Sequence, residues 1–198
     1  AACMASSFEI KSTRPSVGET IVTIVRDHID YRKQIFKLAG SDLRRTYRAS
    51  ALGWSWAIIK PLVTIFVYWF AFAIGLRRGG DIEGYPFVLW LISGIVPWFY
   101  MSEMLTLGTE CILRNRYLVT KMKYPVSTIP TFTSISKFSV HLILMMITIL
   151  IFVITGNELT IYLVQLPFYM LCNFLFFTGW AMSVSYTHLR AHETEADL

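Results

Sequence analysis

The sequence predicts an all-α integral membrane protein. Of its 198 residues, 55% are hydrophobic and only 16% are charged, whereas a soluble domain carries about 25% charged residues. Four stretches approach the length of about 20 apolar residues that a helix needs to cross a bilayer. None of them alternates apolar and polar residues with the period of two expected of a transmembrane β-barrel strand.

The four predicted spans are residues 57–76, 86–108, 138–155 and 159–183. The first places Pro61 in its opening turn, where a proline is tolerated, and requires Lys60 to extend its ammonium group to the near interface. In the second, Pro97 is expected to produce a kink, and Glu103 lies toward the far end.

The distribution of lysine and arginine predicts the orientation of these spans. Residues 26–60 hold eight cations against three aspartates, and the loop 109–137 holds five cations against Glu110. Positively charged loops stay in the cytoplasm. We therefore expect both segments, and the N-terminus, to be cytoplasmic, and the two other connections to lie outside.

The residues before the first span divide into two predicted parts. Residues 1–27 contain no apolar core of a signal peptide and are expected to form a mobile cytoplasmic arm. Residues 28–56 are expected to form short amphipathic helices that divide at Gly40–Ser41 and lie on the membrane surface. A positively charged flank without a surface role remains an alternative.

Motifs for catalysis are missing from the sequence as printed. It contains no HExxH, GxSxG or Walker phosphate-binding motif. We expect a transport subunit that is not an enzyme and has no cofactor of its own, with ATP and Mg²⁺ bound by a separate chain. Glu103 and His141 are ionisable residues within spans; they are either functional or, respectively, hydrated and hydrogen-bonded to a neighbouring helix.

The C-terminal residues look different from the rest of the chain. His188 and His192 have the i, i+4 spacing of a zinc site. However, the run VSYTHLRAHET closely resembles a translated sequencing adapter, so we expect residues 184–198 to be a non-native tail and expect no metal site.

Three stretches carry a resemblance to a known family. They are LGWSWAIIKPLVTIFVYWFAFAIGLR, GYPFVLWLISGIVPWFYMSE and NRYLVTKMKYPVSTIPTFTSISKF. In this order they resemble the permease subunit of type-2 ABC exporters for polysaccharides and polyol phosphates, which move O-antigen, capsule and teichoic-acid polymers. The most specific parts are LGWSWAIIKP and the KMKYP that is followed by IP.

The resemblance implies partners and a location. Permeases of this family have six spans, form a homodimer in the bacterial cytoplasmic (inner) membrane, and pair with a separate ABC ATPase. The expected substrate is a lipid-linked polysaccharide or polyol phosphate; membrane lipids are further partners, and nucleic acid is not expected. Because only four spans are present, we expect the chain alone to be inactive.

The resemblance also implies site residues. The loop after the second span matches a coupling helix that docks on the ATPase, here residues 112–124. Apolar side chains of such a helix fill a shallow pocket while its cations pair with acidic rim groups. The expected contacts are Arg114, Arg116, Tyr117, Leu118, Lys121, Met122 and Tyr124. An ordinary positive-inside loop is the alternative.

The resemblance implies two further sets of site residues. Arg44, Arg45 and Tyr47 match the family's interface helix, which lies along the membrane near the ATPase. Aromatic rings that give weak, repeated contacts to sugars are expected along the polymer path, although interfacial aromatic belts explain many of the same positions. These residues are Tyr68, Trp69, Phe72, Trp98, Phe99 and Tyr100.

Two other functions remain open from the sequence. One is a proton-coupled secondary transporter that uses Glu103 and His141 as relay groups. The other is a membrane scaffold that docks a cytosolic partner without transporting anything.

Overall fold

The structure is a computed structural model that describes residues 17–48, 52–75, 80–82, 84–122, 124–156 and 161–196, without the side chains of Val17, Tyr186 and residues 188–196. In order, the elements are α1 (Val17–Asp30), α2 (Arg32–Tyr47), the 3₁₀ turn η1 (Gly53–Ser55), α3 (Trp56–Trp69), the π-helical η2 (Phe70–Gly75), α4 (Phe87–Thr106), α5 (Cys111–Arg114), α6 (Arg116–Met122), the 3₁₀ turn η3 (Val126–Thr128), α7 (Ile129–Ile154), η4 (Ile161–Gln165) and α8 (Leu166–Ala196). Within these residues, β-structure is limited to an isolated bridge between Ile82 and Tyr85.

Four helical segments in the described part are long and apolar enough to span a membrane. They are Gly53–Gly75, Phe87–Thr106, Val126–Ile154 and Ile161–Ser185. The predicted class, an all-α integral membrane protein, is confirmed. The third helix begins before the predicted start at residue 138, because α7 already starts at Ile129 with Pro130 in its first turn, where a missing N–H is tolerated.

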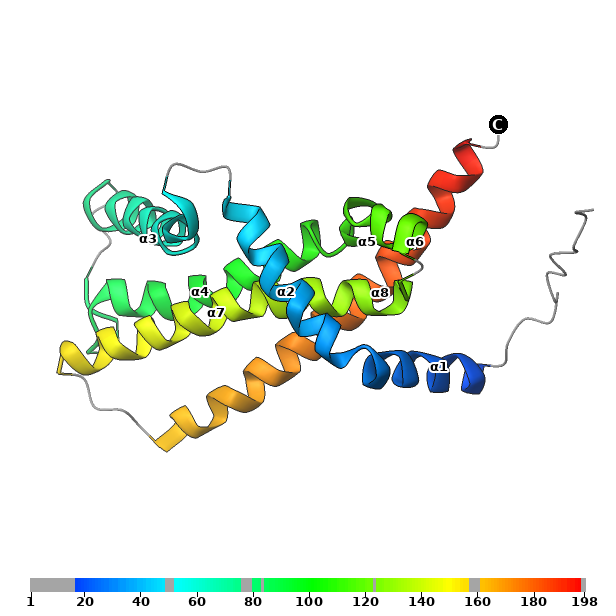
Figure 1. Cartoon of the computed structure of the whole chain (residues 1–198). Coiled ribbons are helices and arrows are strands. Elements are labelled where there is room, and N and C mark those ends of the chain that lie inside the picture. Colours follow the sequence, from blue (N-terminus) through cyan, green and yellow to red (C-terminus); the bar gives the residue numbers. More distant parts are fainter. Residues whose placement is uncertain are drawn as a thin grey trace, which may run out of the picture.

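Helix α7 lies at the centre of the fold (Figure 1). It packs against α2, α4 and α8, while α3 packs mainly on α4. The end of α4 approaches α8 closely at Gly108, where an added Cβ would lie 3.1 Å from Ala181 Cβ and 2.3 Å from the Met104 carbonyl oxygen. This approach requires glycine, and it fixes the point at which the chain leaves α4 for α5.

The first helix corrects the prediction of a mobile arm through residue 27. Residues 17–27 belong to α1, while residues 1–16 lie outside the described part. Asp27 accepts a 2.9 Å hydrogen bond from Ser127, and His28 Nε2 lies 2.8 Å from Thr131 Oγ1. These bonds hold α1 against the start of α7.

The predicted division at Gly40–Ser41 is also wrong. Helix α2 continues through both residues, and the chain turns at Tyr31 instead. Glycine inside a helix costs about 1 kcal/mol relative to alanine. Ile35 and Ala39, each 4% exposed, bury the same face of α2 in the protein's core, and burying a large aliphatic side chain contributes about 1.5–3 kcal/mol. Packing on protein, rather than on lipid, therefore stabilises the uninterrupted helix.

The last helix passes through the predicted junction without a break. Helix α8 continues beyond Ser183 to Ala196, and Ser185 is buried. The origin of residues 184–198 stays a prediction. The side chains of His188 and His192 lie outside the described part, and the residues that are described contain no cluster suited to a metal ion.

Candidate functional site: the coupling segment, an aromatic groove and an ion-pair cavity

Residues 111–124, here named the coupling segment, connect α4 to α7. The predicted single coupling helix is in fact two short helices, α5 and α6, that meet at Asn115. The Asn115 amide donates a 2.9 Å hydrogen bond from Nδ2 to the Cys111 carbonyl oxygen, and its backbone N–H donates to the same oxygen at 3.2 Å. Both bonds satisfy a carbonyl that would otherwise be left free at the end of α5.

One face of the coupling segment is buried in the protein itself. Leu118 is 3% exposed and packs in a core cluster with Ile35, Ala39 and Phe132. Tyr124 is 7% exposed, and its ring meets that of Tyr31 edge-on at 5.4 Å. The predicted partner contacts of Leu118 and Tyr124 are therefore corrected: both side chains hold the segment on α2 and α7.

The opposite face of the segment is exposed. Met122 is 67% exposed and Tyr117 is 46% exposed. Three cations of the same segment, Arg114, Arg116 and Lys121, are exposed as well. The exposed face consists of Arg114, Arg116, Tyr117, Lys121 and Met122. Apolar groups together with cations suit a protein partner with a shallow pocket and an acidic rim.

A polar link joins α2 to the coupling segment. Arg45 donates a 3.3 Å hydrogen bond from Nη2 to Asn115 Oδ1, and its guanidinium also lies 3.5 Å from the carboxylate of Asp42. Asp42 is only 8% exposed, while Arg44 is exposed. Of the predicted interface residues, Arg45 thus contacts the segment directly. Asn115 was missed, and nothing in the sequence indicated that its side chain would pair with Arg45.

Burial changes the acidity of several groups outside the spans. Burial raises the pKa of the Cys111 thiol to about 11 and also raises the pKa of Tyr124. The pKa of Tyr47 is raised by burial and, to a smaller extent, by the charge of Glu103. These groups stay protonated at neutral pH, which suits packing rather than nucleophilic or acid–base chemistry.

An aromatic groove runs between α3 and α4. It has a volume of about 670 Å³, and its wall includes Tyr68, Phe72, Trp90 and Trp98. Each of these rings is at least 38% exposed. The structure thus brings together three residues of the predicted polymer path, Tyr68, Phe72 and Trp98. Trp90 was missed, although it lies two helical turns before Trp98 on the same side of α4.

The other three aromatic residues predicted for the path lie elsewhere. Tyr100 is 3% exposed, and its hydroxyl lies 2.8 Å from Ser134 Oγ, so it belongs to the packing between α4 and α7. Phe99 lines a different cavity, and Trp69 does not line the groove. Neighbours on a helix point in different directions, so consecutive aromatic residues do not share one wall.

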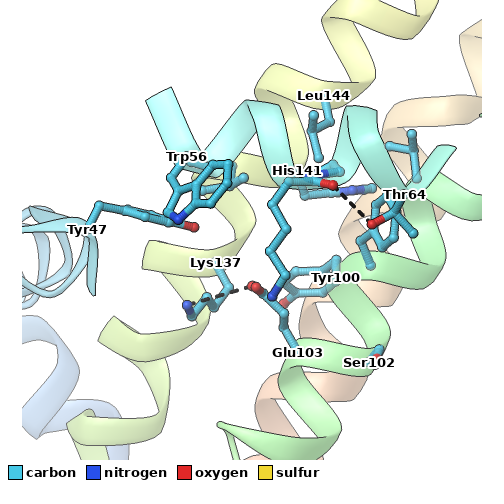
Figure 2. Close-up of a pocket in the computed structure, with 15 residues that line it drawn as sticks. Tyr47, Trp56, Thr64, Tyr100, Ser102, Glu103, Lys137, His141 and Leu144 are labelled. Atoms are coloured by element: carbon cyan, nitrogen blue, oxygen red, sulfur yellow. Dashed lines mark hydrogen bonds and ion pairs between the residues drawn. The ribbon is translucent and has the colours of Figure 1, made fainter. Parts of the chain in front are cut away.

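That second cavity, the ion-pair cavity, lies among α2, α3, α4 and α7 and has a volume of about 160 Å³. Figure 2 shows Glu103 of α4 and Lys137 of α7 reaching toward each other, with a closest N–O distance of 3.7 Å. Lys137 is 3% exposed and is therefore buried. His141 and Tyr100 line the same cavity.

Known proteins are similar in sequence to a large part of this chain. The O-antigen export system permease protein RfbA of Myxococcus xanthus is 29% identical over 130 residues, which cover 64% of this chain and 48% of the relative. The protein of the same name from Klebsiella pneumoniae is 28% identical over 47% of this chain and 34% of that relative. This chain is similar to O-antigen export permeases. The predicted resemblance to ABC exporter permeases is thereby confirmed.

These matches cover only part of each relative. The chain spans about half the length of the Myxococcus permease and about a third of the Klebsiella one. No family model matches the chain. The similarity to permeases agrees with four helices suited to a membrane, so the chain is a multi-pass membrane protein.

Proposed function

We propose that this chain supplies the coupling segment and four spans of a permease subunit in an ATP-driven exporter. The substrate is a lipid-linked cell-envelope polysaccharide or polyol phosphate of the O-antigen, capsule or teichoic-acid type. The subunit works as a homodimer in the bacterial cytoplasmic membrane, with the N-terminus and the coupling segment in the cytoplasm. ATP and Mg²⁺ bind to a separate ABC ATPase.

The observation that carries this proposal is the two-faced coupling segment on a chain similar to permeases. Its inner face, with Leu118, is fixed in the core, and its outer face offers Met122 and Tyr117 to a partner. A rigidly anchored segment transmits a displacement to the helices on which it is packed, because packed cores move as units rather than deform continuously.

Two connections carry such a displacement to the groove. Arg45 and Asn115 join the segment to α2, and the chain passes directly from α5 through Gly108 into α4. Trp90 and Trp98 of α4 form the groove with Tyr68 of α3 and Phe72 of η2. When ATP binding draws the two ATPases together, movement of the segments would shift α4 against α3 and change the width of the groove.

Aromatic rings suit a path for a polymer of sugars. Their faces pack against the C–H faces of sugar rings. Among the described residues, the groove wall contains no charged side chain, which avoids tight ionic binding. A second permease copy would close the open side of the groove. Contacts that are weak and repeated allow a chain to slide.

The test is co-expression of the chain with the ATPase subunit of an O-antigen export system, followed by affinity purification of the membrane chain. The proposal requires the ATPase to co-purify with it and requires loss of this association when the exposed face of the segment is altered. Failure of the ATPase to associate with the unaltered chain would contradict the proposal.

The ion-pair cavity favours one alternative function, because Glu103 and His141 line the same cavity. In a proton-coupled transporter these groups would exchange protons during the cycle. Transport that stops when the proton gradient is collapsed, but continues after ATP depletion, would support this alternative against the exporter. Docking without transport under either condition would instead indicate a scaffold.

A further inference from the structure

The ion-pair cavity contains cationic groups with few partners. Lys137 is 3% exposed, and its recorded contact within the described residues is the 3.7 Å approach to Glu103. A charge-assisted hydrogen bond has a length of about 2.7–2.9 Å. An ammonium group has three N–H donors, and a buried charge requires partners for them. The donors of Lys137 are therefore available to another acceptor in the cavity.

Other polar groups of the cavity also indicate that it can hold a hydrogen-bond acceptor with negative charge. His141 is 3% exposed, and its Nδ1 has no hydrogen-bond partner among the described residues. Lys60 contributes a second ammonium group from α3. In a formal count that takes Lys60 and Lys137 as positive, Glu103 as negative and histidine as neutral, the cavity has one positive charge in excess. A ligand group with a single negative charge would balance it.

The cavity is lined in part by residues at the ends of spanning helices. Trp56 and Lys60 lie near the beginning of α3, and Glu103 lies near the end of α4, immediately before the coupling segment. These are the ends of spanning helices, where headgroups lie and where tryptophan and lysine side chains are frequent. Figure 2 shows Trp56 beside Tyr47 at one side of the cavity.

The remaining wall is suited to a lipid rather than a free anion. Phe99, Val140 and Leu144 line the cavity alongside its charged groups. On α3 the neighbouring residues Leu62 and Val63 are 43% and 54% exposed, so an apolar surface leads away from Lys60. A headgroup in the cavity would keep its acyl chains on that surface. The volume of about 160 Å³ corresponds to about five water molecules, enough for a phosphate group and part of its ester.

From these observations we propose that the ion-pair cavity binds the phosphodiester headgroup of a membrane lipid. A phosphodiester carries one negative charge, and its unesterified oxygens accept hydrogen bonds from Lys60 and Lys137. Glu103 limits the positive charge of the cavity and so limits the affinity. The proposal concerns lipid binding by this chain and does not depend on export, on an ATPase or on the polymer.

The test is native mass spectrometry of the full chain in detergent micelles, with added phosphatidylglycerol, diacylglycerol of the same acyl chains, or inorganic phosphate. The variants are Lys60→Gln and Glu103→Gln, and Lys37→Gln on the exposed side of α2 is the matched control. Lys60 is exposed, so its substitution is not expected to disturb folding.

We expect the chain to retain phosphatidylglycerol in preference to diacylglycerol. Lys60→Gln should weaken retention by about tenfold, the effect of losing one hydrogen bond to a charged group. Glu103→Gln should strengthen retention, and Lys37→Gln should leave it unchanged. A structural ion pair alone would not give strengthening by Glu103→Gln.

Three results would overturn the proposal. One is equal retention of diacylglycerol and phosphatidylglycerol. Another is retention that does not respond to Lys60→Gln. The third is displacement of the lipid by inorganic phosphate at an equal concentration, which would identify a site for the free anion.

Discussion

Arg45 of α2 donates a 3.3 Å hydrogen bond to the side chain of Asn115, which lies at the turn where α5 meets α6. The same asparagine caps the end of α5 through its 2.9 Å bond to the Cys111 carbonyl oxygen. One side chain therefore fixes the angle between the two halves of the coupling segment and ties both to α2. Since Arg45 also lies beside Asp42, the position of its guanidinium is set from α2 itself.

Removal of the hydrogen bond between Arg45 and Asn115 should destabilise the coupling segment, and the effects of changing the two residues should not be additive. We expect Arg45→Ala and Asn115→Ala each to lower the melting temperature, and the double variant to lower it by less than the sum. Because Arg45 is partly exposed, a coupling free energy of about 0.5–1 kcal/mol is expected from the double-mutant cycle. Arg44→Ala, on the exposed neighbour, is the control and should have little effect. Additive losses would show that the two residues act independently.

The close approach at Gly108 should not accept a side chain. Gly108→Ala would place a Cβ 2.3 Å from the Met104 carbonyl oxygen in the preceding turn and 3.1 Å from Ala181 Cβ of α8, so the backbone at residue 108 would have to shift. We expect a loss of about 1–3 kcal/mol, typical of overpacking, measured by thermal unfolding in detergent. At Gly179 of α8 an added Cβ meets nothing within 4 Å. Gly179→Ala should therefore be neutral or slightly stabilising, and equal losses in both variants would contradict the account.

The aromatic groove should bind sugars through its exposed rings. Trp98→Ala is expected to weaken binding of a soluble fragment of the exported polysaccharide by about three- to tenfold, as removal of one aromatic contact of about 0.5–1.5 kcal/mol would do. Binding can be measured by titration calorimetry. Trp180→Ala is the control, because Trp180 is similarly exposed but lies on α8, away from the groove. Equal weakening in both variants would remove the groove from the polymer path.

The buried thiol of Cys111 should make stability fall in alkaline solution. Burial raises its pKa to about 11 from a reference value of 9.0. The unfolded chain therefore loses this proton at a lower pH than the folded chain, so the contribution to stability is complete below pH 9 and disappears as the pH rises toward 11. Thermal unfolding of Cys111→Ala should depend less on pH within this window than that of the unaltered chain. An identical dependence would contradict the assignment.

Much of the architecture was predictable because hydropathy and length constrain a membrane helix strongly. The four spans follow from runs of apolar residues; three lie close to their predicted positions, and the third begins earlier than predicted, at Val126. The start of α7 was not predictable from hydropathy, because Thr128, Ser134 and Ser136 are polar but fully buried against protein rather than lipid. The continuous helix across Gly40 has the same origin, since tertiary packing of Ile35 and Ala39 exceeds the local preference for a break.

The candidate site was predictable only as a set of residue types. A basic stretch with apolar residues between two spans indicates a docking loop, but it does not distinguish the buried Leu118 from the exposed Met122. Which side chain of the segment points into the protein depends on the turn at Asn115. The pairing of Glu103 with Lys137 depends on the register between α4 and α7, which no local pattern encodes.

The exposed face of the coupling segment is the proposed docking surface for the ATPase. Met122→Asp adds a carboxylate to a side chain that is 67% exposed, so folding and membrane insertion should be retained. Leu118→Asp, by contrast, would place a charge in the core and is expected to lower the yield of folded protein. Tyr85→Asp, at an exposed site before the opposite end of α4, is the matched control.

The most direct measurement is the amount of ATPase that co-purifies with each folded variant from membranes. The account predicts a loss of at least about tenfold for Met122→Asp, as expected when a charge is placed in an apolar contact, and wild-type recovery for Tyr85→Asp. Recovery of the ATPase with Met122→Asp at the level of the unaltered chain would contradict the docking assignment.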